Sequence, residues 1–295
     1  MDAADHGLRP GGGVSPGGWS RWGAPLALWA LTLVIFWPAL RWLMTVTLDQ
    51  QQLLQAVAVF GVAGLLLATE GGGLRLEGRF GPAVTWRLVA AYALVGLAMW
   101  LKWPVLVLAA LVVAIGAAAR FVFGDRARHA SRWVVPAFGL YLLFVLAMPF
   151  FDWPLRVLSG RVGAWLLDAL GKQVQLFVLL RPEPSLMLVA GGRVFEVAAE
   201  CNGFGLLTSC SLLALLLAGA SGERWWLRVA KAMASVVVGF VTNVVRIAAI
   251  CLLSAWVGQA HYHVMHEVVG TACVVAALAA VWWLWRGRRG PCKVH

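Results

Sequence analysis

Three side chains in the sequence supply the groups that acyl transfer through a thioester requires. Cys201 carries a thiol, His266 an imidazole and Arg246 a permanently charged guanidinium. A thiol nucleophile needs a base that takes its proton and later returns it to a leaving amine, and imidazole is suited to both steps near neutrality. A fixed positive charge could stabilise a thiolate or an oxyanion. The three residues therefore form a candidate catalytic set.

The residues around Cys201 favour a reactive cysteine. It stands in the run Glu200-Cys201-Asn202-Gly203, directly before an apolar stretch. The glycine permits a tight turn into that stretch, and the amino end of a helix stabilises a thiolate. Cys201 has no obvious disulfide partner in an oxidising compartment, which makes it an exported free thiol. The other cysteines lie in apolar stretches or in the C-terminal tail: Cys210, Cys251, Cys273 and Cys292.

Arg246 lies inside an apolar stretch. A charged side chain there costs about 2.5–3.5 kcal/mol or more and is a functional candidate by default. Asn243 precedes it by three residues and therefore shares its helical face. Glu200 and Glu267 adjoin Cys201 and His266 and could orient His266 or Arg246, although immediate neighbours on a helix do not face each other.

Each of the three residues also has a purely structural interpretation. Arg246 could pair with a helix carbonyl or a buried acid and order a bundle. Cys201 could be a small apolar residue at the start of a helix. His266 could lie at a membrane interface with its ring toward water.

Metal binding is a further alternative for the histidine cluster. His261, His263 and His266, with Glu267, offer nitrogen and oxygen ligands. Their spacing matches no standard zinc pattern. We therefore expect no metal and no cofactor.

Composition excludes an ordinary soluble globule. Hydrophobic residues make up 61% of the 295 residues and charged residues 13%, whereas soluble domains are about one quarter charged. The net charge of +11 is explained by basic loops on one side of a membrane, so we expect no nucleic-acid partner. The sequence predicts an all-α polytopic membrane protein in contact with the lipid bilayer.

Apolar stretches bounded by charges, Gly or Pro predict about eight transmembrane helices. Five of them fill residues 25–151 and three fill residues 203–286. A polar leader (1–24) precedes them, a cap (152–202) separates the two groups, and a basic tail (287–295) follows. The predicted spans are residues 25–44, 53–69, 83–101, 104–123, 134–151, 203–220, 232–257 and 265–285.

The distribution of Lys and Arg predicts the orientation of these spans. Basic residues concentrate in alternate loops, while the short loops on the other side keep only Arg41 and Lys102. By the positive-inside rule both termini are cytoplasmic. Cys201 and His266 then stand at the outer starts of two spans, and Arg246 lies in the outer half of the span between them. The three side chains could meet at the outer face.

The cap is the longest segment between predicted spans. Residues 154–170 repeat apolar residues three and four apart, which is typical of an amphipathic helix lying on a membrane. Residues 174–180 and 186–197 resemble two short strands joined by turns, a possible hairpin. This small cap leads the chain to Cys201.

Three motifs in this chain resemble those of the exosortase/archaeosortase family. That family carries Cys-Ser-Gly, Asn-x-x-Arg and His-x-x-x-Gly, in this order, on the last three of about eight spans. The resemblance covers residues 150–285 well, and Asn202 stands where serine is usual. The matching runs are Cys201-Asn202-Gly203, Asn243-Val244-Val245-Arg246 and His266-Glu267-Val268-Val269-Gly270.

The resemblance implies a membrane cysteine protease or transpeptidase in the bacterial inner membrane. Its partners would be exported proteins whose C-terminal sorting signal consists of a short motif, one transmembrane helix and a basic tail. Cys201 would be the nucleophile, Arg246 the charge stabiliser and His266 the general acid and base, facing the periplasm. Neither the recognition motif nor the acceptor follows from these residues.

A membrane transporter or polysaccharide-export component is the competing interpretation. Arg246 would bind an anionic solute and the histidines would relay protons. The sequence shows neither two repeated halves nor a pair of interrupted helices, which many transporters have. A catalytically inactive scaffold is a third alternative, and it would tolerate replacement of Cys201.

Overall fold

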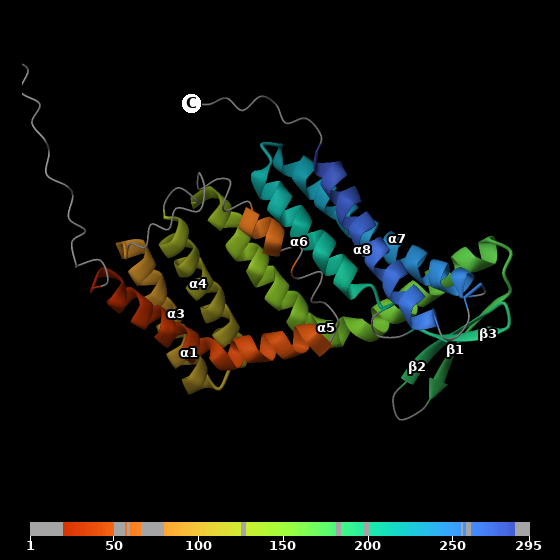
Figure 1. Cartoon of the computed structure of the whole chain (residues 1–295), viewed down its shortest axis with the longest axis horizontal. Helices are drawn as coiled ribbons and strands as arrows, with labels where there is room; N and C mark the ends of the chain where they lie inside the picture. The colour runs from red at the N-terminus through yellow and green to blue at the C-terminus, as the bar shows by residue number, and fades with distance from the viewer. Residues whose placement is uncertain are drawn as a thin grey trace, which may run out of the picture.

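The computed structural model describes residues 20–49, 57, 60–65, 80–124, 128–180, 184–197, 201–254, 256–257 and 261–286. Within these residues the chain is a bundle of long helices with one small sheet at one end (Figure 1). The helices are α1 (Ser20–Asp49), α3 (Pro82–Leu101), α4 (Pro104–Phe123), α5 (Arg128–Ala169), α6 (Phe204–Ala220), α7 (Trp225–Leu253) and α8 (Tyr262–Trp285).

The helices confirm an all-α polytopic membrane protein. In the described residues, six helices are long and apolar enough to cross a membrane, and α6 is a shorter apolar helix. Large apolar side chains such as Trp86, Met99 and Trp283 are exposed, as a bilayer requires. Of the predicted span 53–69, only residue 57 and residues 60–65 are described, and all are helical. Residues 1–19 of the predicted leader and the predicted tail (287–295) lie outside the described residues, whereas residues 20–24 of that leader already belong to α1.

The longest helix, α5, differs from the sequence prediction. We expected a span ending at residue 151 and a separate amphipathic helix over 154–170. Instead α5 is continuous for 42 residues, so the predicted boundary falls inside it. Pro149 and Pro154 lie within the helix, and Figure 1 shows that α5 changes direction along its length. Internal prolines bend a helix without ending it when packing holds both halves.

The sheet of the cap has three strands where two were expected. β1 (Val174–Leu180), β2 (Pro184–Ala190) and β3 (Arg193–Glu196) form an antiparallel sheet in this order. Gly191 and Gly192 have φ angles of 57° and 77°, which a tight hairpin turn requires at both central positions. The turn therefore divides the predicted strand 186–197 into β2 and β3.

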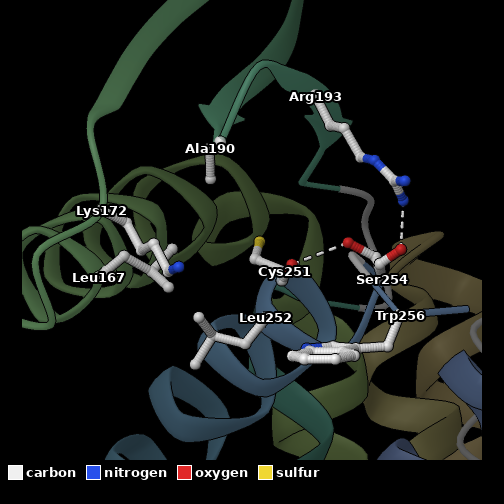
Figure 2. A pocket seen from close by; sticks show the side chains of 9 residues that line it. Leu167, Lys172, Ala190, Arg193, Cys251, Leu252, Ser254 and Trp256 are labelled. Atoms are coloured by element: carbon white, nitrogen blue, oxygen red, sulfur yellow. Dashed lines mark hydrogen bonds between the residues drawn. The ribbon is translucent and has the colours of Figure 1, made fainter.

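Alternate residues of β2 attach the sheet to the helices. Leu186, Leu188 and Ala190 are buried in a cluster with Leu167 of α5 and Ile247 of α7. A polar contact adds to this packing, because the Arg193 guanidinium donates to the backbone carbonyl of Ser254, just after α7 (Figure 2). The cap is thereby tied to both helices that border it.

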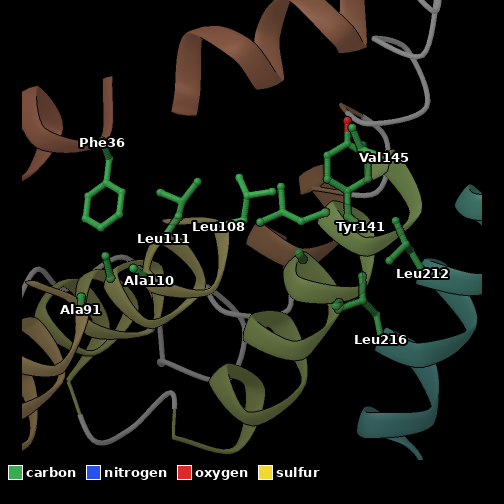
Figure 3. Close-up of a cluster of buried hydrophobic side chains, with 13 residues drawn as sticks. Phe36, Ala91, Leu108, Ala110, Leu111, Tyr141, Val145, Leu212 and Leu216 are labelled. Carbon is green, nitrogen blue, oxygen red and sulfur yellow. The ribbon is translucent and has the colours of Figure 1, made fainter. Parts of the chain in front are cut away.

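The N-terminal helices pack on the C-terminal half of the chain through one apolar core. Figure 3 shows this cluster, which includes Phe36 of α1, Leu111 of α4, Tyr141 of α5 and Leu212 of α6. The Tyr141 hydroxyl lies 2.8 Å from the hydroxyl of Thr47, which satisfies both groups inside the bundle. Helices α6 and α7 contact each other, and each of them also contacts α5 and α8. This packing positions the residues described next.

Candidate active site

Cys201 and His266 meet at the end of the bundle that carries the sheet. Cys201 precedes α6 by three residues, and His266 lies in the second turn of α8. The Cys201 Sγ atom is 3.6 Å from His266 Nε2, a hydrogen-bonding distance for sulfur. The thiol is 7% exposed. The structure therefore brings together the two side chains that the sequence analysis assigned as nucleophile and base.

The other ring nitrogen of His266 faces Glu267. The distance from His266 Nδ1 to Glu267 Oε1 is 3.9 Å, and the glutamate side chain is about half exposed. This separation is too long for a hydrogen bond but short enough for an electrostatic contact. Glu267 thus lies where it can favour one orientation of the ring. Glu200, the other predicted neighbour, lies outside the described residues.

Arg246 packs across Gly270. A Cβ atom at Gly270 would lie 2.9 Å from Arg246 Nη2 and 3.2 Å from Cζ. Gly270 follows His266 by one helical turn of α8. The guanidinium of Arg246, which belongs to α7, therefore lies against α8 one turn beyond the His266 imidazole. The motif His266-Glu267-Val268-Val269-Gly270 thus contains the imidazole and, one turn later, a glycine that leaves room for the Arg246 guanidinium.

Asn243 holds the backbone at Cys201. It is fully buried, and its Nδ2 donates to the Cys201 carbonyl at 2.9 Å and to Ser159 Oγ at 3.2 Å. Gly203 has a φ of 83°, and a Cβ there would lie 2.6 Å from Asn243 Nδ2. Both the left-handed backbone and the close amide demand glycine at this position.

Asn202 connects the same loop to α5. Its side-chain oxygen accepts the Phe204 N–H at 2.7 Å, at the start of α6, as in an Asx turn. Its Nδ2 donates to Asp152 Oδ1 at 2.5 Å. Asp152 also pairs with Arg156 at 2.5 Å. Asn202 is 3% exposed, and both the oxygen and the nitrogen of its side-chain amide are hydrogen-bonded.

The sequence analysis missed Asp152 and Ser159. Ser159 Oγ donates to the Asn202 carbonyl at 3.3 Å, so both residues of α5 support the loop that carries Cys201. Asp152 directly follows the predicted span 134–151, where a charged residue indicates the end of an apolar stretch and not a contact with the loop of Cys201. Nothing in the sequence distinguished Ser159 as a functional candidate, since a single serine in an apolar helix is common.

A cleft opens at the Cys201–His266 pair. Cap residues form one wall and helix residues the other, so the sheet contributes directly to the surroundings of the thiol. The cleft is lined by Leu188, Phe195, Glu196, Val197, Cys201, Ile247, Ile250, Cys251, Tyr262 and His266.

A larger cavity, of about 310 Å³, adjoins this cleft and shares Cys251 with it. Lys172 and Arg193 lie on opposite sides of the cavity, and Leu252 and Trp256 lie below them in the view of Figure 2. The surface next to the thiol is therefore partly apolar and partly cationic. Within the described residues, no three His, Cys, Asp or Glu side chains gather where they could hold a metal ion.

Comparison with known proteins assigns the chain to a family. The profile of the transmembrane exosortase family matches residues 55–283, more than half of the chain. The chain therefore belongs to the transmembrane exosortases, as its three motifs predicted. No curated protein and no solved structure matches it.

Proposed function

We propose that this exosortase is a cysteine protease or transpeptidase of the bacterial inner membrane. It cleaves the C-terminal sorting signals of exported proteins, each a short motif followed by a transmembrane helix and a basic tail, on the periplasmic side. The observation that carries the proposal is the 3.6 Å contact between Cys201 Sγ and His266 Nε2. A nucleophile and its base must lie within such reach of each other.

The first half of the reaction forms a thioester. His266 Nε2 takes the proton from Cys201 Sγ, and the thiolate attacks the carbonyl carbon of the scissile peptide bond. The carbon–nitrogen bond then breaks. His266 returns its proton to the departing amine. This amine is the new amino terminus of the released fragment, which contains the transmembrane helix of the substrate. The exported protein remains bound to Cys201 as an acyl group.

The second half releases the exported protein. Water or an acceptor amine attacks the thioester, and His266 takes the proton of the attacking group. The carbon–sulfur bond breaks and the Cys201 thiol is restored. Hydrolysis and transfer differ only in the attacking group, so the same residues serve both.

Arg246 supplies a fixed positive charge to this chemistry. Its guanidinium lies against Gly270, one turn of α8 from His266. In a site with little water, such a charge stabilises a developing thiolate or oxyanion strongly. We assign this role to Arg246.

Processing of a membrane-anchored reporter tests the proposal. The reporter carries the C-terminal segment of an exported protein from the same genome and is expressed with wild type, Cys201→Ala, His266→Ala or Arg246→Ala. We expect wild type to shorten the reporter and each variant to lose at least about 100-fold of the rate, the usual scale for an acid–base or charge-stabilising group. Cys210→Ala, on α6 and away from the cleft, is the matched cysteine control.

Two outcomes would contradict the proposal. Processing by a well-expressed Cys201→Ala variant would exclude this cysteine as the nucleophile and reopen the transport and scaffold alternatives. The second outcome concerns the thioester intermediate. Hydroxylamine attacks thioesters and should capture the acyl group as a hydroxamate. If hydroxylamine does not yield a hydroxamate of the shortened reporter with wild type, the acyl-enzyme step is wrong.

A further inference from the structure

A further cavity lies at the other end of the helix bundle. It has a volume of about 380 Å³ and is bordered by α3, α4 and α5. Arg87 of α3, Arg120 of α4 and Arg132 of α5 line it. The loop of Cys201 is supported instead by Ser159, which lies 27 residues after Arg132 in the 42-residue helix α5. The cavity is therefore separate from the candidate active site.

The three arginines lie at the depth of lipid headgroups. Arg87 is the sixth residue of α3, Arg120 the fourth from the end of α4, and Arg132 the fifth of α5. At 1.5 Å per residue, each lies within about 8 Å of the end of its helix. This depth corresponds to the interfacial layer of a bilayer, where the phosphates of phospholipids lie.

The cavity combines positive charge with donors suited to phosphate. None of its described lining residues is Asp or Glu. Arg87 Nη1 already donates to the Gly116 carbonyl at 3.5 Å, but a guanidinium has five N–H donors and can bind phosphate as well. The positive-inside rule explains an excess of arginines in the loops on one side of a membrane. It does not explain why arginines from three different helices line the same cavity.

Apart from the three arginines and Ser131, the side chains that line the cavity are apolar, and this favours an amphiphilic ligand. Val112 and Val113 of α4 and Val135 and Pro136 of α5 border the cavity. Phosphate alone gains nothing from such a surface, whereas an amphiphile can bury its glycerol and first methylenes there. We propose that this cavity binds an anionic phospholipid of the leaflet opposite to Cys201, with its phosphate on the three arginines.

Thermal unfolding of the purified full-length protein in detergent tests this site without any assay of processing. Phosphatidylglycerol, phosphatidylcholine with the same acyl chains, and inorganic phosphate are added separately. We expect phosphatidylglycerol to raise the midpoint by about 5 °C, the size expected for a ligand near saturation on a protein of this length. Phosphatidylcholine and inorganic phosphate should raise it much less.

Variants then locate the effect. Arg132 is exposed, so Arg132→Gln carries little risk to folding, and we expect it to weaken the apparent affinity about tenfold, as loss of one charged contact does. The triple variant R87Q/R120Q/R132Q should lose the stabilisation. Arg224→Gln is the matched control, because Arg224 is exposed at the start of α7, at the same end of the bundle but outside the cavity. Native mass spectrometry should detect retained phosphatidylglycerol on wild type and on Arg224→Gln.

Three results would overturn the proposal. If phosphatidylglycerol stabilises a folded triple variant as much as wild type, the cavity is not the site. If the triple variant does not fold, Arg132→Gln decides instead. An affinity for phosphatidylglycerol equal to that of wild type would show that the cavity is not the site. Equal stabilisation by inorganic phosphate would show that a soluble phosphate, and not a lipid, is the ligand.

Discussion

Gly203 lies between Cys201 and the first residue of α6, and the positive φ and the close contact at this glycine lead to a prediction. Gly203→Ala places a methyl group 2.6 Å from Asn243 Nδ2 at a φ of 83°. The strained backbone costs about 1–3 kcal/mol, and the amide must move away from the Cys201 carbonyl. We expect reporter processing to fall at least tenfold together with a lower unfolding midpoint. Gly96→Ala is the matched control, because nothing lies within 4 Å of a Cβ at Gly96, and it should change neither quantity.

Gly270 gives a different prediction, because the group that its Cβ would meet can move. The Arg246 guanidinium is the end of a flexible side chain, so Gly270→Ala should fold and yet displace the charge. We expect an unfolding midpoint close to wild type and processing reduced about 100-fold, comparable with Arg246→Ala. Normal processing by Gly270→Ala would mean that the observed position of Arg246 is not needed for the reaction.

At the scale of the elements, the C-terminal part of α5 supports the loop that carries Cys201. Asp152 accepts a hydrogen bond from Asn202, which is 3% exposed. Asp152→Ala leaves this buried amide unsatisfied, at a cost of about 1–3 kcal/mol. We therefore expect a lower unfolding midpoint and slower processing, measured side by side.

Asp168→Ala provides the control for this element, because Asp168 is an exposed acid on the same helix. It should behave as wild type in both measurements. If Asp152→Ala matches it, the bond between Asp152 and Asn202 does not position the nucleophile.

At the scale of the whole molecule, the orientation in the membrane is the property to test. The positive-inside rule predicts that the α4–α5 loop and the C-terminus are cytoplasmic and that the β1–β2 turn is periplasmic. Alkaline phosphatase, which is active only outside the cytoplasm, should be active when inserted at residue 182 and inactive when inserted at residue 126 or fused after residue 295. Activity at residue 126 would reverse the orientation and place the Cys201–His266 pair in the cytoplasm.

Hydropathy and motif order determined much of this protein from its sequence. Long apolar runs must satisfy their backbone groups as helices in a bilayer, so seven of the eight predicted spans correspond to helices in the described residues. Family membership followed from three short motifs, because a thiol, an imidazole and a guanidinium at fixed places in the chain are rare together. These are local properties, and neighbouring residues suffice to specify them.

Only the tertiary structure decided how those residues meet. The continuity of α5 through Pro149 and Pro154, the third strand of the cap and the contacts of Asp152 and Ser159 depend on packing between segments far apart in the chain. The same holds for the 3.6 Å distance between Cys201 and His266, which are 65 residues apart. The ends and bends of a helix depend both on the local helix propensity and on how its side chains are buried against other elements. Those other elements are distant in the sequence, so a short segment does not reveal them.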